Sequence, residues 1–483
     1  MSFNRHWREE CGVVGIAAID GAAELASLAL HALQHRGQES AGITASDGHQ
    51  LRTFKKMGLV ADVFDEKTTR DLVGNYAIGH VRYSTSGSSH ILNAQPLQVA
   101  SHRGSISLAH NGNLVNAPEL RREMEADGSI FSTTSDSEVI LHMLARSRAI
   151  AAEDALLELL PRIKGAYSLL IMTRDRLIAV RDPHGFRPLC LGRYKDSYVI
   201  ASESCAFDII GATYLRDIEP GEMVILGDGE LTSRHMGSAE NEQCCVFEHV
   251  YFSRPDSQIF GTSVEAVRRR SGEFLGREAP AEADLVCAVP DSSNTAALGY
   301  AQETGLPFEL ALIRNHYVGR TFISPAQKVR DMSVRIKFNP VKEVVEGKRV
   351  VMIDDSIVRG TTMRKLVKLM KQAGALEVHL RIASPPVTNP CFYGIDTPVR
   401  NELIASSHTV EEIATYLRVD SLHYLSLDGL MEAAGGAERY CDACFTGNYP
   451  VSFSEVGTKD VFDNHAAGRE IVVKPMPANT DGS

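Results

Sequence analysis

Hydrophobic and polar positions follow one pattern in the first half of the chain. Short apolar runs there have the length and spacing of β-strands, and a stretch with helical spacing runs from Glu24 to Gln34. Ser135 and Glu138 have the spacing of a capping box in front of a further helix. This half is expected to form mainly antiparallel sheets with helices, and its strands are predicted over residues 11–18, 77–81, 106–109, 166–172, 177–180, 198–202 and 222–226.

A second pattern begins near Ser263, where helical and strand-like segments alternate. This alternation is typical of a doubly wound parallel sheet. The two patterns meet between Gly237 and Gln258, and the polar residues beyond about Val456 indicate a loosely held tail. Helices are predicted over residues 264–278, 295–303 and 361–373, and strands over 284–289, 308–313, 349–353 and 377–383.

Composition and charge narrow the class of protein. The chain has 50 Lys and Arg against 61 Asp and Glu, a net charge of −11, so nucleic acid and anionic lipid are not expected as partners. An apolar run of about 18 residues is absent, and residues 1–10 lack the apolar stretch of a secretion signal. We therefore expect no membrane contact and a cytosolic location. Nine cysteines, a sparse and odd number, favour reduced thiols over a disulfide scaffold.

A phosphate-binding loop is the main chemical feature of the second half. The apolar segment Val350 to Ile353 leads directly into Asp354-Asp355-Ser356-Ile357-Val358-Arg359-Gly360-Thr361-Thr362. Backbone N–H groups and hydroxyls at the start of a helix suit a phosphate monoester, and the neighbouring carboxylates suit ribose hydroxyls and a magnesium shell. The plainer alternative is a capped strand-to-helix turn with exposed acids.

This string resembles the phosphoribosyl pyrophosphate (PRPP) motif of type I phosphoribosyltransferases. Upstream, residues 289–293 look like the pyrophosphate loop of that family, and residues 314–322 resemble the lid that closes over PRPP in glutamine amidophosphoribosyltransferases. Lid closure would exclude water from a reactive ribosyl cation. The lid departs from the family pattern at Arg314, where lysine is common, and at His316, where arginine is expected; the alternative is a basic surface loop.

Four strings of the first half resemble amidotransferases that use an N-terminal cysteine as nucleophile. They are Cys11 to Ile16, Leu33 to Gly42, Gly79 to Thr85 and His110 to Leu114. Taken alone, Cys11 would be interpreted as a small buried hydrophobic residue. A leader over residues 1–10 has a physical purpose here, because a free α-amine with a pKa of about 7.7 to 8.0 can act as a base, whereas a peptide nitrogen cannot.

The remaining cysteines suggest a metal centre. Cys441 and Cys444 are spaced for one centre, with Cys391 and one residue of the Cys244-Cys245 pair as distant partners. Four thiolates form either a zinc site or a 4Fe-4S cluster, and spacing does not separate the two. A fortuitous pair is the third alternative. The resemblance implies the cluster, because amidophosphoribosyltransferases with a leader also carry one; no role is assigned to Cys190, Cys205, Cys244 and Cys287.

The amidophosphoribosyltransferase resemblance also implies the roles of individual residues. The catalytic residues would be Cys11, Asn111 and Gly112, and glutamine would be bound by Arg82, Thr85 and Asp136. PRPP would be bound by Asp291, Ser292, Arg320, Asp354, Asp355, Ser356, Arg359, Gly360, Thr361 and Thr362. Magnesium would be held by Ser292, Asp354 and Asp355, and the 4Fe-4S cluster by Cys245, Cys391, Cys441 and Cys444.

The resemblance further implies the architecture and the reaction. A propeptide (1–10) would precede a four-layer α/β/β/α amidotransferase domain (11–243), a type I phosphoribosyltransferase domain (244–460) and a flexible tail (461–483). Glutamine, PRPP and water would give 5-phosphoribosylamine, glutamate and pyrophosphate, with ammonia passing inside the protein. Members of the family are typically cytosolic homotetramers inhibited by purine nucleotides.

Two other functions are weighed against this one. A purine-responsive transcription regulator would need a basic recognition helix, which the sequence lacks. A glutaminase serving another acceptor would keep the first half but lack the string from Asp354 to Thr362, which is present.

Overall fold

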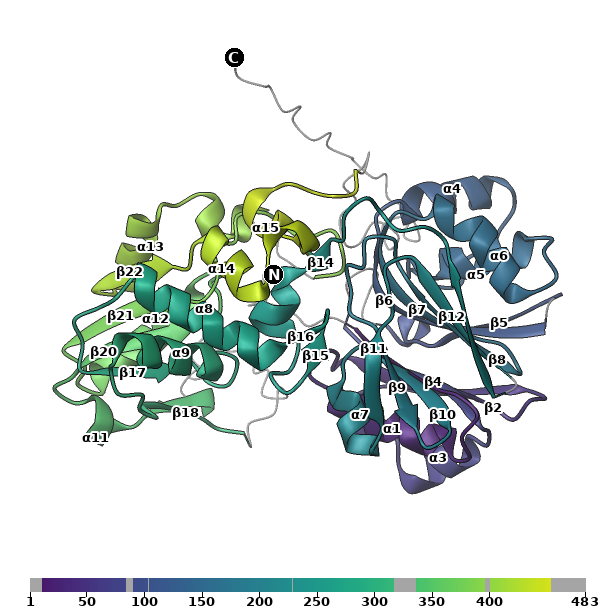
Figure 1. The fold of residues 1–483 in the computed structure, drawn as a ribbon, viewed down its shortest axis with the longest axis horizontal. Coiled ribbons are helices and arrows are strands. Elements are labelled where there is room, and N and C mark those ends of the chain that lie inside the picture. Colours follow the sequence, from purple (N-terminus) through teal and green to yellow (C-terminus); the bar gives the residue numbers. More distant parts are fainter. Residues whose placement is uncertain are drawn as a thin grey trace, which may run out of the picture.

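The computed structural model describes residues 11–83, 90–102, 104–227, 229–316, 336–395 and 400–452. The chain folds into two halves that lie side by side (Figure 1), the first drawn in purple to teal and the second in teal to yellow. Among the described residues, no helix is both long and apolar enough to cross a membrane.

One antiparallel sheet of seven strands forms the first layer of strands in the first half. Its order is β11-β9-β10-β1-β4-β2-β3, and α1 (Ala22–Ala32) and α7 (Cys205–Ile210) cover its outer face (Figure 1). The strands are β1 (Gly12–Ile16), β2 (Ser40–Ser46), β3 (Leu51–Met57), β4 (Tyr76–Arg82), β9 (Cys190–Tyr194), β10 (Ser197–Ala201) and β11 (Thr213–Asp217).

A second antiparallel sheet of six strands packs on the first. Its order is β13-β12-β8-β7-β6-β5, and its outer face is covered by α4 (Ala117–Ala126), α5 (Glu138–Arg146) and α6 (Ala152–Leu159). The strands are β5 (Leu97–Ser101), β6 (Gly104–Leu114), β7 (Gly165–Met172), β8 (Arg176–Arg181), β12 (Glu222–Gly227) and β13 (Glu230–His235).

The alternation of side chains along β1 explains why this half has four layers. Val13 packs into the cluster between the two sheets, whereas Val14 and Ile16 pack under α1 and α7. Gly15 also faces the other sheet, where a Cβ would lie 3.0 Å from Leu177. Both faces of the strand are therefore buried. The expected α/β/β/α sandwich is confirmed.

The capping box expected at Ser135 is wrong. The Glu138 carboxylate accepts from the backbone N–H groups of Ser132 at 2.8 Å and of Thr133 at 2.7 Å, upstream of Ser135. The N-cap of α5 is Ser137, and its side chain makes no cap hydrogen bond. The carboxylate thus holds the approaching loop instead of closing a box, because the helix begins two residues later than expected.

The second half is built on a parallel sheet of four strands in the order β17-β20-β21-β22. Its strands are β17 (Leu285–Ala288), β20 (Arg349–Asp354), β21 (Glu377–Ile382) and β22 (Ser421–Tyr424). One face packs on α8 (Val264–Glu278), α9 (Asn294–Thr304) and α14 (Leu427–Ala434). The other packs on α12 (Thr361–Gln372) and α13 (Val410–Leu417). The doubly wound sheet is confirmed.

The single strand expected over residues 308–313 is wrong. Phe308 makes an isolated parallel bridge with Val286, and the pairing then stops. β18 (Leu312–Arg314) pairs instead with β19 (Phe338–Pro340), antiparallel and outside the parallel sheet. The break falls where the chain turns outward, since Leu310 is 63% exposed.

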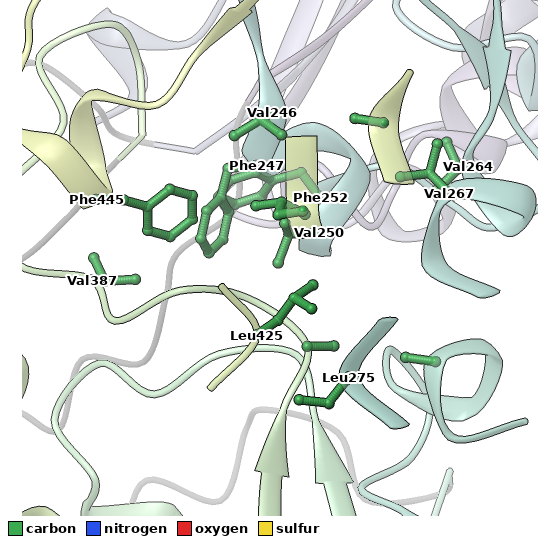
Figure 2. Close-up of a cluster of buried hydrophobic side chains, with 14 of the residues drawn as sticks. Val246, Phe247, Val250, Phe252, Val264, Val267, Leu275, Val387, Leu425 and Phe445 are labelled. Atoms are coloured by element: carbon green, nitrogen blue, oxygen red, sulfur yellow. The ribbon is translucent and has the colours of Figure 1, made fainter. Parts of the chain in front are cut away.

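Several short elements complete the fold. A buried apolar cluster surrounds the π-helical turn η3 (Glu248–Phe252), where Phe247 lies against Phe252 and Phe445 (Figure 2). Other short elements include α2 (Val60–Val63), α3 (Glu66–Asp71), β14 (Cys244–Cys245), β15 (Gln258–Ile259), β16 (Thr262–Ser263), α11 (Lys342–Val345), β23 (Tyr440–Cys441) and α15 (Ala443–Thr446).

Candidate active sites

Cys11 lies at the start of β1, beside the end of β4. The register pairs Gly12 with Val81, which brings Cys11 next to Arg82. The Cys11 Sγ donates to the Tyr83 carbonyl oxygen at 3.4 Å. Burial raises the pKa of the thiol to about 11, and Arg82 opposes that shift. Because a thiol is a weak nucleophile until it loses its proton, this cysteine needs a base close by.

Asn111 and Gly112 lie on β6, which crosses β1 in the facing sheet. The Asn111 side-chain nitrogen is buried, and no hydrogen-bond partner for it is present in the described part of the chain. Gly112 has φ +148°, and a Cβ there would overlap the Ala166 carbonyl oxygen, so only glycine fits. A buried amide N–H without an acceptor is what an oxyanion site requires.

Two charged groups flank the thiol. Arg82 is buried at the end of β4, with its Nη1 3.5 Å from the Glu39 carboxylate. Asp136 is buried in front of α5 and accepts from the Leu114 backbone N–H at 2.9 Å. Arg82 lowers the pKa of Cys11, whereas Glu39 and Asp136 raise it. Thr85 and the leader lie outside the described residues.

A buried ionic cluster behind Cys11 escaped sequence reasoning. Arg36 Nε donates to the Cys11 carbonyl oxygen at 3.1 Å, and its Nη atoms reach Glu203 at 2.6 Å and Glu248 at 2.7 Å. Burial raises the pKa of Glu203, but His35 and Arg36 outweigh it and lower the pKa to about 2. Arg36 stands inside a string that resembles the family, which was the available signal; no role was assigned to Glu203 or Glu248.

The predicted PRPP loop lies at the carboxyl ends of β17 and β20, which are neighbours in the sheet. Asp354 ends β20, and Ser293 Oγ donates to its Oδ1 at 3.0 Å. Ser292 Oγ donates to Asp355 Oδ1 at 2.6 Å, and Ser356 Oγ donates to Asp355 Oδ2 at 2.6 Å. Ligands of open α/β sheets bind at this edge.

The backbone after these acids turns sharply into α12. Gly360 has φ +70° and is the N-cap residue of α12, which starts at Thr361 with Thr362 next. A left-handed residue at this position lets the chain enter the helix directly from the loop. The first N–H groups of α12 therefore lie directly behind the two acids, an arrangement that suits a phosphate.

The two carboxylates repel one another in a buried setting. Burial raises the pKa of Asp355, and burial together with Asp355 raises that of Asp354. A divalent cation would offset this negative charge. Within the described residues, no set of three or more His, Cys, Asp or Glu is arranged to hold a metal ion. Magnesium at this edge would therefore take part of its shell from substrate or water, as it commonly does.

Other predicted PRPP residues lie around this loop. Asp291 accepts from Arg314 Nη1 at 2.8 Å, and Arg359 forms an ion pair with Glu402. Of the lid, residues 314–316 are described, and Arg320 lies outside the described residues.

The four cysteines assigned to a metal centre line one small cavity. Cys245 in β14 pairs in parallel with Cys441 in β23, and Cys444 follows in α15. The segment 388–391, which ends at Cys391, is held beside α15, because the Asn389 N–H donates to the Cys444 carbonyl oxygen at 3.1 Å. Cys244 points elsewhere, since its sulfur accepts from Arg181 at 3.6 Å. Burial, followed by the other three sulfurs, raises the pKa of Cys444.

The spacing of these four cysteines does not match a single-ion site. A tetrahedral zinc at about 2.3 Å from each sulfur would bring the four sulfurs within about 4 Å of one another. The described residues include no cluster of three or more such ligands close enough for a single ion, although all four sulfurs share one cavity. Tyr393 N–H donates to Cys391 Sγ at 3.3 Å, a bond that favours a thiolate.

The fold and these sites define a class of protein, a glutamine amidotransferase joined to a phosphoribosyltransferase. Family models support both parts: a glutamine amidotransferase domain matches residues 80–208, and a phosphoribosyl transferase domain matches residues 262–383.

Comparison with whole proteins makes the assignment specific. The chain is 51% identical to the amidophosphoribosyltransferase of Bacillus subtilis over 450 residues, which covers 92% of this chain and 94% of that protein. It is 53% identical to the amidophosphoribosyltransferase of Archaeoglobus fulgidus, covering 92% and 98%. The chain belongs to the amidophosphoribosyltransferase family. Its activity is therefore the glutamine-dependent conversion of PRPP to phosphoribosylamine, the first step of purine biosynthesis.

Solved structures agree with this assignment. The glutamine PRPP amidotransferase from B. subtilis complexed with ADP and GMP superposes with a TM-score of 0.89 at 49% identity, covering 93% of this chain and 100% of that one. A structure described as the allosteric regulatory enzyme of purine biosynthesis gives a TM-score of 0.88 at 50% identity, covering 92% and 97%.

Proposed function

We propose that Cys11 is the nucleophile of the glutaminase reaction and that its own α-amine, once freed, is the base. The amine would take the thiol proton, and the sulfur would then attack the glutamine carboxamide, forming a glutamyl thioester and releasing ammonia. Water would hydrolyse the thioester to glutamate. The pairing of the strands that carry Cys11 and Arg82, together with the buried and unsatisfied Asn111 side-chain nitrogen, carries this proposal.

The neighbouring groups would stabilise the oxyanion and bind the substrate. Asn111 Nδ2 and the Gly112 N–H would hold the oxyanion, and each such donor contributes about 2.7 to 4 kcal/mol in comparable sites. Arg82 would bind the substrate carboxylate and Asp136 its α-ammonium, with Thr85 nearby. The buried positions of Arg82 and Asp136 support these roles, because charges in a water-poor pocket bind their counter-charges strongly.

Removal of the leader is the step that would create the base. Intact mass measurement of the purified protein should therefore show a chain that begins at Cys11. A variant that retains residues 1–10 should form phosphoribosylamine from ammonia and PRPP but not from glutamine. Full glutamine activity in a chain with an intact leader would contradict the role of the amine.

In the second half, we propose that the loop from Asp354 to Thr362 binds the ribose 5-phosphate part of PRPP, with Arg359 beside it. Asp291, Ser292 and Arg320 would bind the pyrophosphate. Magnesium, held by Ser292, Asp354 and Asp355 directly or through water, would neutralise the leaving pyrophosphate. Support comes from the carboxylates of Asp354 and Asp355, whose pKa values are raised. They accept hydrogen bonds from the hydroxyl groups of Ser293 and Ser292.

Ammonia would travel between the two sites inside the protein. Protonated ammonia is not a nucleophile, so an enclosed path would keep the neutral form at a high effective concentration. Direct buried contacts between the halves support such a path, including the Arg187 Nη2 bond of 2.7 Å to the Tyr393 carbonyl oxygen.

We propose a structural 4Fe-4S cluster at Cys245, Cys391, Cys441 and Cys444. Support comes from the cavity that the four cysteines share and from its all-thiolate ligand set. Anaerobically purified protein should contain iron and acid-labile sulfide in equal amounts, near four of each per chain. Cys444→Ser should lower both, whereas Cys244→Ser, its matched control, should keep them. Stoichiometric zinc without sulfide would contradict the cluster.

We further propose that the domains span residues 11–243 and 244–460 and that residues 461–483 form a tail. Purine nucleotides are proposed as feedback inhibitors, supported by the ADP and GMP in the B. subtilis complex. By analogy with the family, we also propose that the protein is a homotetramer located in the cytosol.

A further inference from the structure

The strand that carries Asn111 loses one neighbouring strand just before the candidate oxyanion site. β6 pairs with β5 in antiparallel register, and the pairing ends at Leu97 and Leu108. Continuing that register would place Gln95 opposite His110, the residue before Asn111. The main-chain groups of His110 on this side therefore need partners other than a strand, because buried N–H and C=O groups are costly when left unpaired.

Two side chains bind these main-chain groups of His110. Gln95 Oε1 accepts from the His110 N–H at 2.7 Å, and His80 Nε2 lies 3.1 Å from the His110 carbonyl oxygen. Because a carbonyl oxygen can only accept, this ring nitrogen carries a proton and donates it. Burial lowers the pKa of His80 to about 3, so the ring is neutral near pH 7. Side chains thus hold β6 directly before Asn111.

The Gln95 amide is itself held in one orientation. Its Nε2 donates to Ser137 Oγ at 3.3 Å, so Oε1 is the atom that faces the His110 N–H. The Gln95 residue is buried, and its backbone lies against the facing sheet, where a Cβ at Gly42 would overlap the Gln95 carbonyl oxygen. With its backbone and its side chain both fixed, Gln95 offers the His110 N–H an acceptor at one defined position.

Asn111 depends on the strand beneath it for its position. Its Nδ2 is buried, and within the described part of the chain no hydrogen-bond partner holds it. A donor that must stay available to a developing oxyanion cannot be fixed by a hydrogen bond of its own, so the backbone that carries it has to be fixed instead. A misplacement of about 1 Å can lower a rate about 10²-fold.

We propose that Gln95 is a positioning residue of the glutaminase reaction, which holds the oxyanion donor Asn111 in place through the His110 N–H. Because the oxyanion forms only on the way to the thioester, a misplaced Asn111 lowers kcat. Glutamine bound by Arg82 and Asp136 keeps its KM. The inference rests on the roles proposed above for Cys11 and Asn111.

The test measures glutamate release from glutamine by the mature holoenzyme at saturating PRPP. Gln95→Met keeps the length of the side chain but removes the acceptor, so kcat should fall at least about tenfold while KM for glutamine stays within about threefold. Gln95→Glu keeps an oxygen for the His110 N–H and should restore kcat to within about threefold of the wild type. Gln98→Met is the matched control, because Gln98 lies on β5 but bonds to Thr53 and Leu51; it should keep both constants.

The split between the two constants separates positioning from general damage. A wild-type kcat in Gln95→Met, an equal loss of kcat in Gln95→Glu, or a change confined to KM would overturn the positioning role. The melting temperature and phosphoribosylamine formation from ammonia report whether each variant is folded.

A double-mutant cycle links the effect to Asn111. Asn111→Ala alone should lower kcat about 10²-fold, the usual cost of one oxyanion donor. Adding Gln95→Met should lower it further by at most about threefold, because the donor that Gln95 positions is already gone. A further tenfold loss would overturn the positioning role, whereas an unchanged kcat in Asn111→Ala alone would contradict the proposed function of Asn111.

A further measurement needs no variant. In residue-resolved hydrogen exchange of the wild-type enzyme, the His110 amide should exchange as slowly as the amides of β6 that are bonded within the sheet. Rapid exchange at His110, with slow exchange along the rest of β6, would overturn the role of Gln95 even if Gln95→Met fails to fold.

Discussion

Replacing Cys11 by alanine should lower glutamine-dependent formation of phosphoribosylamine by at least about 10³-fold, since removal of a covalent nucleophile has effects of this order or larger. Formation from ammonia and PRPP should remain within about twofold of the wild-type rate. The reason is spatial: Cys11 precedes β1 in the first half, whereas the PRPP loop follows β20 in the second. Within the described part of the chain, the removed sulfur donates one weak bond, to the Tyr83 carbonyl oxygen.

Cys190→Ala is the matched control, because Cys190 is a fully buried thiol in the same sheet but lies on β9. Both activities should survive that change. Loss of the ammonia reaction in Cys11→Ala, with an unchanged melting temperature, would contradict the division of labour between the halves. Retention of glutamine activity would contradict the identity of the nucleophile.

Replacing Asp355 by asparagine should lower both the glutamine-dependent and the ammonia-dependent reactions, by about 10²-fold or more. The carboxylate accepts from Ser292 and Ser356 at 2.6 Å each, and burial raises its pKa. Asparagine removes one of two negative charges proposed to attract magnesium, whose stabilisation of a leaving group is worth several kcal/mol. The rate should fall mainly through a higher magnesium requirement, measured by titrating the ammonia reaction with magnesium.

Asp284→Asn is the control for this change. Asp284 precedes β17, at the end of the strand away from the PRPP loop, and it forms a solvent-accessible ion pair with Arg349 at 3.1 Å. Its loss should therefore change stability little. Glutaminase activity in the absence of PRPP should persist in Asp355→Asn. An unaltered magnesium dependence with full ammonia activity would remove Asp355 from the PRPP site.

The sequence predicted those strands and helices whose buried residues follow a regular pattern along the chain. In β20 the apolar residues Val350 to Ile353 continue without interruption, as expected of a strand covered on both faces. Prediction failed where contacts between distant parts of the chain determine whether a strand forms. Residues 308–313 have the pattern of one strand, but the exposed Leu310 interrupts it. β22 was not predicted, because it is short and Leu422 is its one fully apolar residue.

The candidate sites show the same difference between residues with a local sequence signal and residues placed by tertiary contacts. Cys11, Asn111 and Asp355 lie in local strings with a recognisable order, so the order of residues alone was enough to select them. Glu203 could not be selected in this way, because its partner Arg36 is 167 residues away. Nothing local distinguishes a carboxylate that will be buried against a guanidinium from one that will face water.

The central claim is that nitrogen released at Cys11 reaches the PRPP site without leaving the protein. The most direct test supplies amide-¹⁵N glutamine and PRPP in the presence of excess unlabelled ammonium, near neutral pH, and measures the isotope in phosphoribosylamine by mass spectrometry, with pyrophosphate release as the rate. Predominantly ¹⁵N product, with no pyrophosphate when PRPP is omitted, is the predicted result. Product whose label matches the bulk ammonium would contradict it.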